Sequence, residues 1–283
     1  MAEILSGAPV AAAINEKTAR GVQQLAAAGI SPVLALLRIG AREDDVAYEN
    51  SAEKRCAKAG VAVQRITLPE SVTQEQLSAE VQRLNLDPSV NGVMVFMPLP
   101  PHLDAQRLRR ELSPQKDVDG ISFGSLSGVF TASGEGFAPC TAEACIEILD
   151  YYKIDCTGKN AVVIGRSLVV GKPVSMLLLG RNSTVTICHT KTRDLPQTAR
   201  SADLLIAATG KAASIDQSCL SEKQVVIDVG INFANGRLCG DVDFDAAVNT
   251  TAAVTPVPGG VGAVTSALLV NHVVQAALRQ HCL

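Results

Sequence analysis

Apolar positions in the first part of the chain alternate between helical and strand spacing. Over residues 8–28 they recur at intervals of three and four, which predicts a helix, and Gly29 and Pro32 separate it from the apolar run 33–37. The alternation continues with a helix over 44–58, a strand over 61–66, a helix over 72–84, a strand over 92–97 and a helix over 103–112. Strands separated by helices predict a parallel sheet covered on both faces, because parallel neighbours need a crossover of a dozen or more residues.

The second half repeats this alternation after an irregular stretch. Residues 113–139 show no clear period, which predicts a long loop at a domain junction, and a helix is expected over 141–152. Short strands follow at 160–164, 184–188, 203–208, 225–229 and 252–255, and a final helix over 262–280 is long enough to pack back across the first domain. The pattern predicts an α/β protein of two domains, an N-terminal three-layer α/β domain and a C-terminal doubly wound parallel sheet of the Rossmann type.

Composition narrows the class of ligand. The 283 residues are 47% hydrophobic and 19% charged, which excludes a disordered scaffold. The formal charge is −3 and no basic stripe is present, so neither nucleic acid nor an anionic membrane surface is expected as a partner. A small molecule is the favoured ligand.

The cysteines and the N-terminal segment predict a cytoplasmic protein. Eight cysteines occur without any CxxC pair, which favours reduced core residues over disulfides or zinc ligands. The N-terminal segment lacks the basic and apolar regions of a signal peptide, and we expect no apolar run near the ~18 residues that a membrane span requires.

A strand, a glycine turn and the start of a helix follow one another over residues 161–173, which read AVVIGRSLVVGKP. Such a unit brings a phosphate to backbone N–H groups at a helix N-terminus. Only Gly165 and Gly171 are present, so the spacing matches neither GxGxxG nor a Walker A loop. A dinucleotide-binding turn and a purely structural turn are both open interpretations, and we favour the first.

The next strand indicates which dinucleotide would bind. An NAD site places Asp or Glu about 20 residues further on to hold the ribose hydroxyls, and no acidic residue stands there. The strand instead ends in His-Thr-Lys-Thr-Arg at 189–193, and Arg166 adds to this positive charge. Because Arg binds phosphate in bidentate fashion, the pattern favours NADP over NAD. A solvated basic loop is the alternative interpretation.

Two further glycine turns favour a ligand cleft. The strand 225–229 runs into a glycine turn at 230–232, and residues 255–262 contain two prolines and three glycines, a stiff loop that a flat ligand can approach closely. A structural helix entry is the alternative for the second turn. The turn 117–120 lacks the rest of a calcium loop, and the four histidines show no HExxH spacing, so no metal site is predicted.

Together these segments resemble the family of bifunctional methylenetetrahydrofolate dehydrogenase and methenyltetrahydrofolate cyclohydrolase, over nearly the whole chain. The resemblance rests on Tyr48 with its helix and on the motifs Pro98-Leu-Pro100, Lys116-Asp-Val-Asp-Gly120, Pro139-Cys-Thr141, Gly165-Arg-Ser167 with Val170-Gly171, Asp228-Val-Gly-Ile-Asn232, Gly240-Asp-Val242 and Thr255-Pro-Val-Pro-Gly-Gly-Val-Gly262. It implies a folate domain formed by residues 1–140 with the C-terminal helix 262–283, a dinucleotide-binding domain at 141–261, and a homodimer.

The resemblance also assigns residues to each site. It gives catalytic roles to Tyr48 and Asp119. It places the folate substrate, a one-carbon derivative of tetrahydrofolate, against Tyr48, Ala52, Val95, Phe96, Met97, Asp119, Pro258, Gly259, Gly260, Val261 and Gly262. It assigns the cofactor, NADP with NAD as the alternative, to Gly165, Arg166, Ser167, Thr190 and Ile231.

Two positions depart from the family's cyclohydrolase centre, which uses a Tyr, a Lys four residues later, a Gln before the Pro-Leu-Pro turn, and the second Asp of Asp-Val-Asp-Gly. Tyr48 and Asp119 match, but Ala52 takes the Lys position and Phe96 the Gln position. Lys54 is turned about 120° away from the Tyr48 face of the helix. Arg55 returns to that face, but a guanidinium with a pKa above ~12 is a poor general base.

The two family activities need different groups. The cofactor carries out hydride transfer once the protein fixes the geometry, whereas cyclohydrolysis needs a positioned acid or base worth about 10²–10⁴ in rate. We therefore predict NADP-dependent oxidation of 5,10-methylenetetrahydrofolate to 5,10-methenyltetrahydrofolate, with cyclohydrolase activity lost or very weak. Two alternatives stay open: the full bifunctional enzyme, which yields 10-formyltetrahydrofolate, and a non-catalytic paralogue that binds folate or nucleotide.

Overall fold

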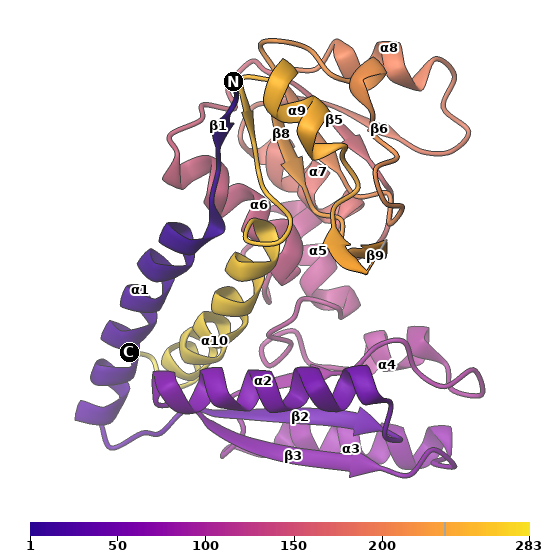
Figure 1. The fold of residues 1–283 in the computed structure, drawn as a ribbon. Coiled ribbons are helices and arrows are strands. Elements are labelled where there is room, and N and C mark those ends of the chain that lie inside the picture. The colour runs from indigo at the N-terminus through magenta and orange to yellow at the C-terminus, as the bar shows by residue number, and fades with distance from the viewer. Residues whose placement is uncertain (235) are drawn as a thin grey trace. The chain divides into compact units, whose positions relative to one another are not determined.

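The chain divides into two compact units, each with its own parallel sheet (Figure 1). The computed structural model describes residues 1–234 and 236–283. Unit 1 comprises Met1–Ala12 with Thr141–Thr265, and unit 2 comprises Ala13–Cys140 with Ser266–Leu283. The predicted domains grouped residues 1–140 together, whereas residues 1–12 fall in unit 1.

Unit 2 is built on a three-stranded parallel sheet in the order β3-β2-β4. Its elements are most of α1 (Gly7–Ala27), β2 (Val33–Ile39), α2 (Glu43–Ala59), β3 (Ala62–Leu68), α3 (Gln74–Leu86), β4 (Gly92–Val95), α4 (Ala105–Glu111) and α5 (Phe123–Thr131). Figure 1 shows α2 running along this sheet. The central strand is apolar on both faces, because Leu34 and Leu36 alternate with Ala35 and Leu37 and all four are fully buried. The carboxyl ends of the strands share one edge, where ligands bind in open α/β sheets.

Helix α5 corrects the sequence prediction, which treated all of 113–139 as loop. Ser122 caps this helix, its hydroxyl accepting a hydrogen bond from the Ser125 backbone N–H at 3.1 Å. Glycine and serine within the helix conceal its apolar period, and Ser125 and Gly128 are buried. Tertiary packing therefore overrides a weak local preference for helix.

Unit 1 contains a six-stranded parallel sheet in the order β1-β11-β8-β7-β5-β6. Its elements are β1 (Glu3–Ile4), α6 (Cys140–Tyr151), β5 (Asn160–Ile164), α7 (Gly171–Gly180), β6 (Thr184–Cys188), α8 (Leu195–Arg200), β7 (Leu204–Ala207), β8 (Val225–Asp228), α9 (Phe244–Thr250) and β11 (Ala253–Val254), with an antiparallel hairpin of β9 (Asn232–Ala234) and β10 (Arg237–Cys239). Strand β1 has only two residues and pairs with β11. A segment this short shows too little alternation of apolar and polar residues to be predicted from the sequence. Strand β6 lies on one side of β5, and β7 lies on the other side, so the order of the strands reverses at β5. The turn after β5 therefore lies at the topological switch point of the sheet.

The last helix, α10 (Val261–Gln280), contradicts the expectation that no apolar run approaches the length of a membrane span. By length and composition it is long and apolar enough to cross a membrane, and its first charged residue is Arg279. However, 67% of its most apolar window is buried inside the protein. A core helix of a folded domain meets the same criteria, and the burial favours that interpretation.

The structure places most of the cysteines, but not all of them, in the core. None of the eight cysteines forms a disulfide. Six are buried, as expected of small core residues, but Cys239 is half-buried and Cys282 is exposed near the C-terminus. Among the described residues no group of three or more His, Cys, Asp or Glu side chains is arranged to hold a metal ion.

Candidate active site

The turn after β5 is packed so tightly that only glycine fits at its two ends. Gly165 has a φ of +137°, and a Cβ there would lie 2.2 Å from the carbonyl oxygen of Ala208. A Cβ on Gly171, where α7 begins, would lie 2.2 Å from the carbonyl oxygen of Gly165. The bare backbone and the N-terminus of a ten-residue helix together fit the phosphates of a dinucleotide.

Arg166 and Thr190 occupy equivalent positions after two neighbouring strands. Ile164 of β5 pairs with Cys188 of β6, and each predicted cofactor residue follows its strand by two positions. Both side chains are exposed. A guanidinium and a hydroxyl at this edge are suited to a phosphate, whereas a carboxylate there would repel one.

The motifs at 228–232 and 240–242 hold each other in place. The buried carboxylate of Asp228 accepts hydrogen bonds from the backbone N–H groups of Gly230, Asp241 and Val242 at 2.9–3.0 Å. Burial raises the pKa of Asp228 to about 6, while these donors oppose the rise. A Cβ on Gly240 would lie 1.8 Å from the Asp228 carboxylate, so this position also requires glycine.

Next to these hydrogen-bonded motifs lies a cavity that is lined by residues predicted for the cofactor and by residues predicted for the substrate. Ile231 is 68% exposed, which is unusual for a large apolar side chain. It lines a cavity of about 180 Å³ together with Leu238 and the loop 256–263, which includes the predicted substrate residues Pro258–Gly262. Unit 1 therefore brings Ile231 and the glycine-rich loop together.

In unit 2, Tyr48 and Phe96 lie next to each other among the remaining residues that were predicted to bind the substrate. Tyr48 is on α2, Phe96 directly follows β4, and their ring centroids are 6.0 Å apart in an edge-on arrangement. Ala52 and Phe96 are buried, with 1% and 7% of their surfaces exposed, and Val95 before Phe96 is also buried. Burial, followed by the charge of Asp119, raises the pKa of Tyr48 to about 12, and Arg55 opposes this rise.

Asp119 faces the same group of residues from the turn after Val118. Gly120 shapes this turn with a φ of +68°, and a Cβ there would lie 2.4 Å from the Pro139 nitrogen. Burial and the nearby Asp117 carboxylate raise the pKa of Asp119 from 3.8 to about 7, against lowering effects of Cys140, His272 and Arg109. Asp119 can therefore carry a proton near neutral pH.

The raised pKa predicts a stability effect for Asp119→Asn. The folded protein binds the Asp119 proton more tightly than the unfolded chain does, so this group makes stability fall as pH rises from about 4 to about 7. The variant lacks this titration, and its free energy of unfolding relative to wild type should increase across that window and then level off. Urea denaturation at several pH values tests this, and a pH-independent difference would contradict it.

Two residues that were not predicted for the site lie beside its titratable groups: Arg55 beside Tyr48, and His272 beside Asp119. The Arg55 guanidinium carbon lies 5.6 Å from the centre of the Tyr48 ring. The His272 ring contacts the carbonyl oxygen of Val118 through Nδ1 at 2.8 Å. Arg55 could be found from its spacing of seven residues from Tyr48, whereas no sequence spacing connects His272 in α10 with Asp119.

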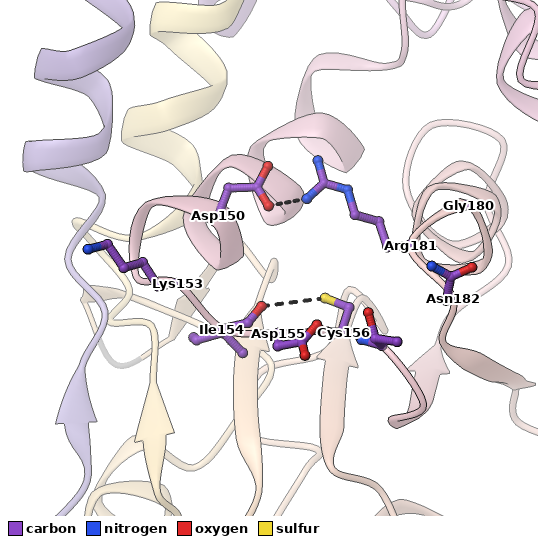
Figure 2. A pocket seen from close by; sticks show the side chains of 9 residues that line it. Asp150, Lys153, Ile154, Asp155, Cys156, Gly180, Arg181 and Asn182 are labelled. Carbon is purple, nitrogen blue, oxygen red and sulfur yellow. Dashed lines mark hydrogen bonds and ion pairs between the residues drawn. The ribbon is translucent and has the colours of Figure 1, made fainter.

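A separate cavity of unit 1 is lined by the segments before β5 and β6 (Figure 2). Its volume is about 450 Å³. Asp150 and Arg181 point toward each other and form an ion pair, and the Asp155 carboxylate accepts a hydrogen bond from the Thr157 backbone N–H at 2.9 Å. The cavity lies at the amino ends of the strands, opposite the Gly165 turn, and these charges are compensated within the protein.

Two family profiles match most of the chain. One is described as tetrahydrofolate dehydrogenase/cyclohydrolase, catalytic domain, and covers residues 5–119. The other is described as tetrahydrofolate dehydrogenase/cyclohydrolase, NAD(P)-binding domain, and covers residues 139–281. The chain belongs to the tetrahydrofolate dehydrogenase/cyclohydrolase family. Family membership confirms the resemblance seen in the sequence and the two-domain α/β fold, and it makes the protein a methylenetetrahydrofolate dehydrogenase with an NAD(P)-binding domain.

Relatives match over almost their whole length. A bifunctional protein FolD 1 of Desulfitobacterium hafniense is 47% identical over 281 residues, which cover 99% of this chain and 100% of the relative. The crystal structure of the bifunctional enzyme FolD of Campylobacter jejuni superposes with a TM-score of 0.96 at 36% identity, over 99% of both chains. A Trypanosoma brucei FolD structure, complexed with NADP and inhibitor, gives a TM-score of 0.90 at 33% identity over 98% of both chains.

Proposed function

We propose that this family member oxidises 5,10-methylenetetrahydrofolate to 5,10-methenyltetrahydrofolate with NADP, and that its cyclohydrolase activity is lost or very weak. The observation that carries the proposal is the apolar surface beside Tyr48. Ala52 lies one helical turn from Tyr48 and Phe96 packs edge-on against its ring, and both are buried. The protein thus has a methyl group and a phenyl ring where the family's centre has an amine and an amide.

The dehydrogenase step places modest demands on these residues. NADP, when bound, supplies the hydride acceptor. The protein must bind and orient the folate and exclude water, which apolar groups such as Phe96 do well. Asp119, which titrates near neutral pH, suits the donor groups of a pterin ring, because a carboxylate accepts hydrogen bonds from amino and ring N–H groups.

Cyclohydrolysis demands more, because a water must attack the methenyl carbon and protons must be moved. Tyr48 holds its proton to a pKa of about 12, so the phenolate is scarce at neutral pH. Neither Ala52 nor Phe96 offers a proton donor or acceptor. Of the family's four groups, Tyr48 and Asp119 remain. A positioned acid or base contributes a factor of about 10²–10⁴ to the rate of hydrolysis, and its loss would lower the rate by that factor.

The full bifunctional enzyme is the second candidate function, and it has support of its own. The relative from Desulfitobacterium hafniense, 47% identical, carries the name of a bifunctional protein, and so does the Campylobacter jejuni structure. In this alternative, Asp119 would be the proton carrier and the Arg55 guanidinium near Tyr48 would supply the positive charge. The product would be 10-formyltetrahydrofolate.

A spectrophotometric time course separates the two candidates. The purified protein is mixed with methylenetetrahydrofolate and either NADP or NAD, and reduced cofactor and methenyl product are followed separately. We expect methenyl product to accumulate in step with reduced cofactor, and faster with NADP. Reduced cofactor without methenyl accumulation would overturn the loss of cyclohydrolase and establish the bifunctional enzyme.

The remaining assignments belong to this proposal. Folate would bind to residues 1–140 with 262–283, and the dinucleotide to 141–261, through the site residues named from the sequence. A homodimer is supported by the exposed apolar side chains of the β9–β10 hairpin, Phe233 at 78% and Leu238 at 42%. Sedimentation giving the mass of one chain would exclude the dimer. Eight cysteines without a disulfide support a cytoplasmic location, which cell fractionation can test.

A further inference from the structure

Arg55 carries two buried donor nitrogens that make no hydrogen bond of good geometry within the protein, although its guanidinium also lies close enough to the Tyr48 hydroxyl to act on it as a donor. Its Nη1 donates to the hydroxyl of Ser51 at 2.6 Å. Its Nε and Nη2 are the two buried nitrogens without such a bond. An unpaired buried donor on a charged group costs stability, so it calls for a specific explanation, and a ligand that supplies the missing acceptor is one.

The position of Arg55 on α2 directs these donors toward Tyr48. Tyr48, Ala52 and Arg55 are spaced by four and three residues and therefore share one face of the helix. Side chains on a helix lean toward its N-terminus, so Arg55 reaches back over the turn that holds Ser51 and Ala52. Its guanidinium carbon comes to 5.6 Å from the Tyr48 ring centre. The small methyl group of Ala52 leaves this path free.

The charges around Arg55 favour a role in which its guanidinium binds a hydrogen-bond acceptor over a role in proton transfer. Arg55 and Asp119 both act electrostatically on Tyr48, with opposite signs. Arg55 therefore adds a permanent positive charge to a site that already contains a carboxylate able to accept hydrogen bonds. Arg55 is only partly buried as a whole residue, so a rotation about its last side-chain bonds can present the donors to a ligand.

We propose that Arg55 is a substrate-positioning residue whose Nε–H and Nη2–H groups bind an oxygen acceptor of the folate. This inference rests on the proposed function. A planar fork of donors matches a carboxylate or a carbonyl oxygen. The folate offers three such acceptors: the carbonyl of its pterin ring, the amide carbonyl of its aminobenzoyl group and the carboxylates of its glutamate. Because a guanidinium keeps its proton, Arg55 orients the substrate for hydride transfer without contributing acid–base chemistry to hydrolysis.

The test compares Arg55→Ala and Arg55→Lys with Lys54→Ala, which removes the same charge from the exposed neighbouring residue. For Arg55→Ala we expect the KM for methylenetetrahydrofolate to rise about 10-fold or more, with the KM for NADP and kcat changed less than about threefold, as for a lost charge-assisted hydrogen bond. Lys54→Ala should resemble wild type. Arg55→Lys should recover part of the affinity at pH 7, because an ammonium keeps the charge but not the planar fork of donors, and should lose this gain at high pH as the ammonium deprotonates, whereas wild type shows no such loss.

A substrate without glutamate, methylenetetrahydropteroate, identifies the acceptor. If Arg55→Ala raises its KM by the same factor, the acceptor belongs to the pteroyl part of the folate, and if the effect vanishes, it is the glutamate carboxylate. An unchanged folate KM in Arg55→Ala, or equal losses in the Ala and Lys variants at pH 7, would overturn the inference. If Arg55→Ala does not fold, Arg55→Gln keeps most of the side chain and serves in its place.

Failure of this inference can be told from failure of the proposed function. If wild type does not reduce NADP with methylenetetrahydrofolate, the proposed function fails. Binding of tetrahydrofolate to wild type and Arg55→Ala, measured by calorimetry, then still tests Arg55 directly. A dissociation constant raised about 10-fold in the variant would support the role, and an equal dissociation constant would refute it.

Discussion

The double variant Ala52→Lys with Phe96→Gln should hydrolyse methenyltetrahydrofolate about 10²-fold faster than the wild-type protein, since a positioned acid or base contributes at least that factor. The lysine would stand one helical turn from Tyr48, on the same face, and the amide would replace the phenyl ring that packs against Tyr48. The rate is measured as loss of methenyl absorbance beyond the rate in buffer. The matched control is Ala52→Met with Phe96→Gln, which adds a side chain of similar length without the amine.

The position of Arg55 affects how this experiment is designed. Its side chain extends back toward Tyr48 over the turn that contains Ala52, so a lysine at 52 and Arg55 would compete for the same space. Two adjacent positive charges also disfavour each other. Adding Arg55→Ala should therefore raise hydrolysis further at saturating substrate. A folded double or triple variant that binds NADP normally and still hydrolyses at the wild-type rate would show that more of the site has diverged.

Arg166→Ala should raise the KM for NADP about 10- to 100-fold and leave the KM for NAD within about threefold, because a bidentate contact to a phosphate is worth roughly 1.5–3 kcal/mol. Arg166 is exposed at the carboxyl edge of the sheet, two residues after the last paired position of β5. The difference between the two cofactors is the 2′-phosphate, so only the phosphate contact can produce a selective loss. Initial rates with each cofactor at fixed methylenetetrahydrofolate give both constants.

The matched control for this variant is Arg193→Ala, which removes an equal charge from the segment after the neighbouring strand β6. A general electrostatic effect of the basic segment would weaken NADP equally in both variants. Equal losses for NADP and NAD in Arg166→Ala would instead indicate that Arg166 contacts a part of the dinucleotide that both cofactors share. Either result would contradict the assignment of Arg166 to the 2′-phosphate.

The sequence by itself determined the parts of this protein that depend on local pattern and on motif. Elements with a clear apolar pattern, such as α1 and β2, appear near their predicted bounds, because the spacing of apolar residues reports directly which face is buried. The departures at Ala52 and Phe96 could also be read directly, since the gap-free helix around Tyr48 fixes the first position and the turn that begins at Pro98 fixes the second. The same holds for the glycine turn at Gly165, which only a residue without a side chain can form.

Tertiary structure decided what depends on contacts between distant residues. Strand β1 has two residues and is defined only by its pairing with β11, and helix α5 is held by a cap and by burial rather than by its own apolar period. The pKa of Asp119 depends on burial and on Asp117, Cys140, His272 and Arg109, and these residues come from separate segments of the chain. Spacing alone placed Arg55 on the Tyr48 face, but only the folded structure shows that two of its donor nitrogens are buried without a hydrogen bond of good geometry. Whether a polar group is satisfied depends on everything packed around it.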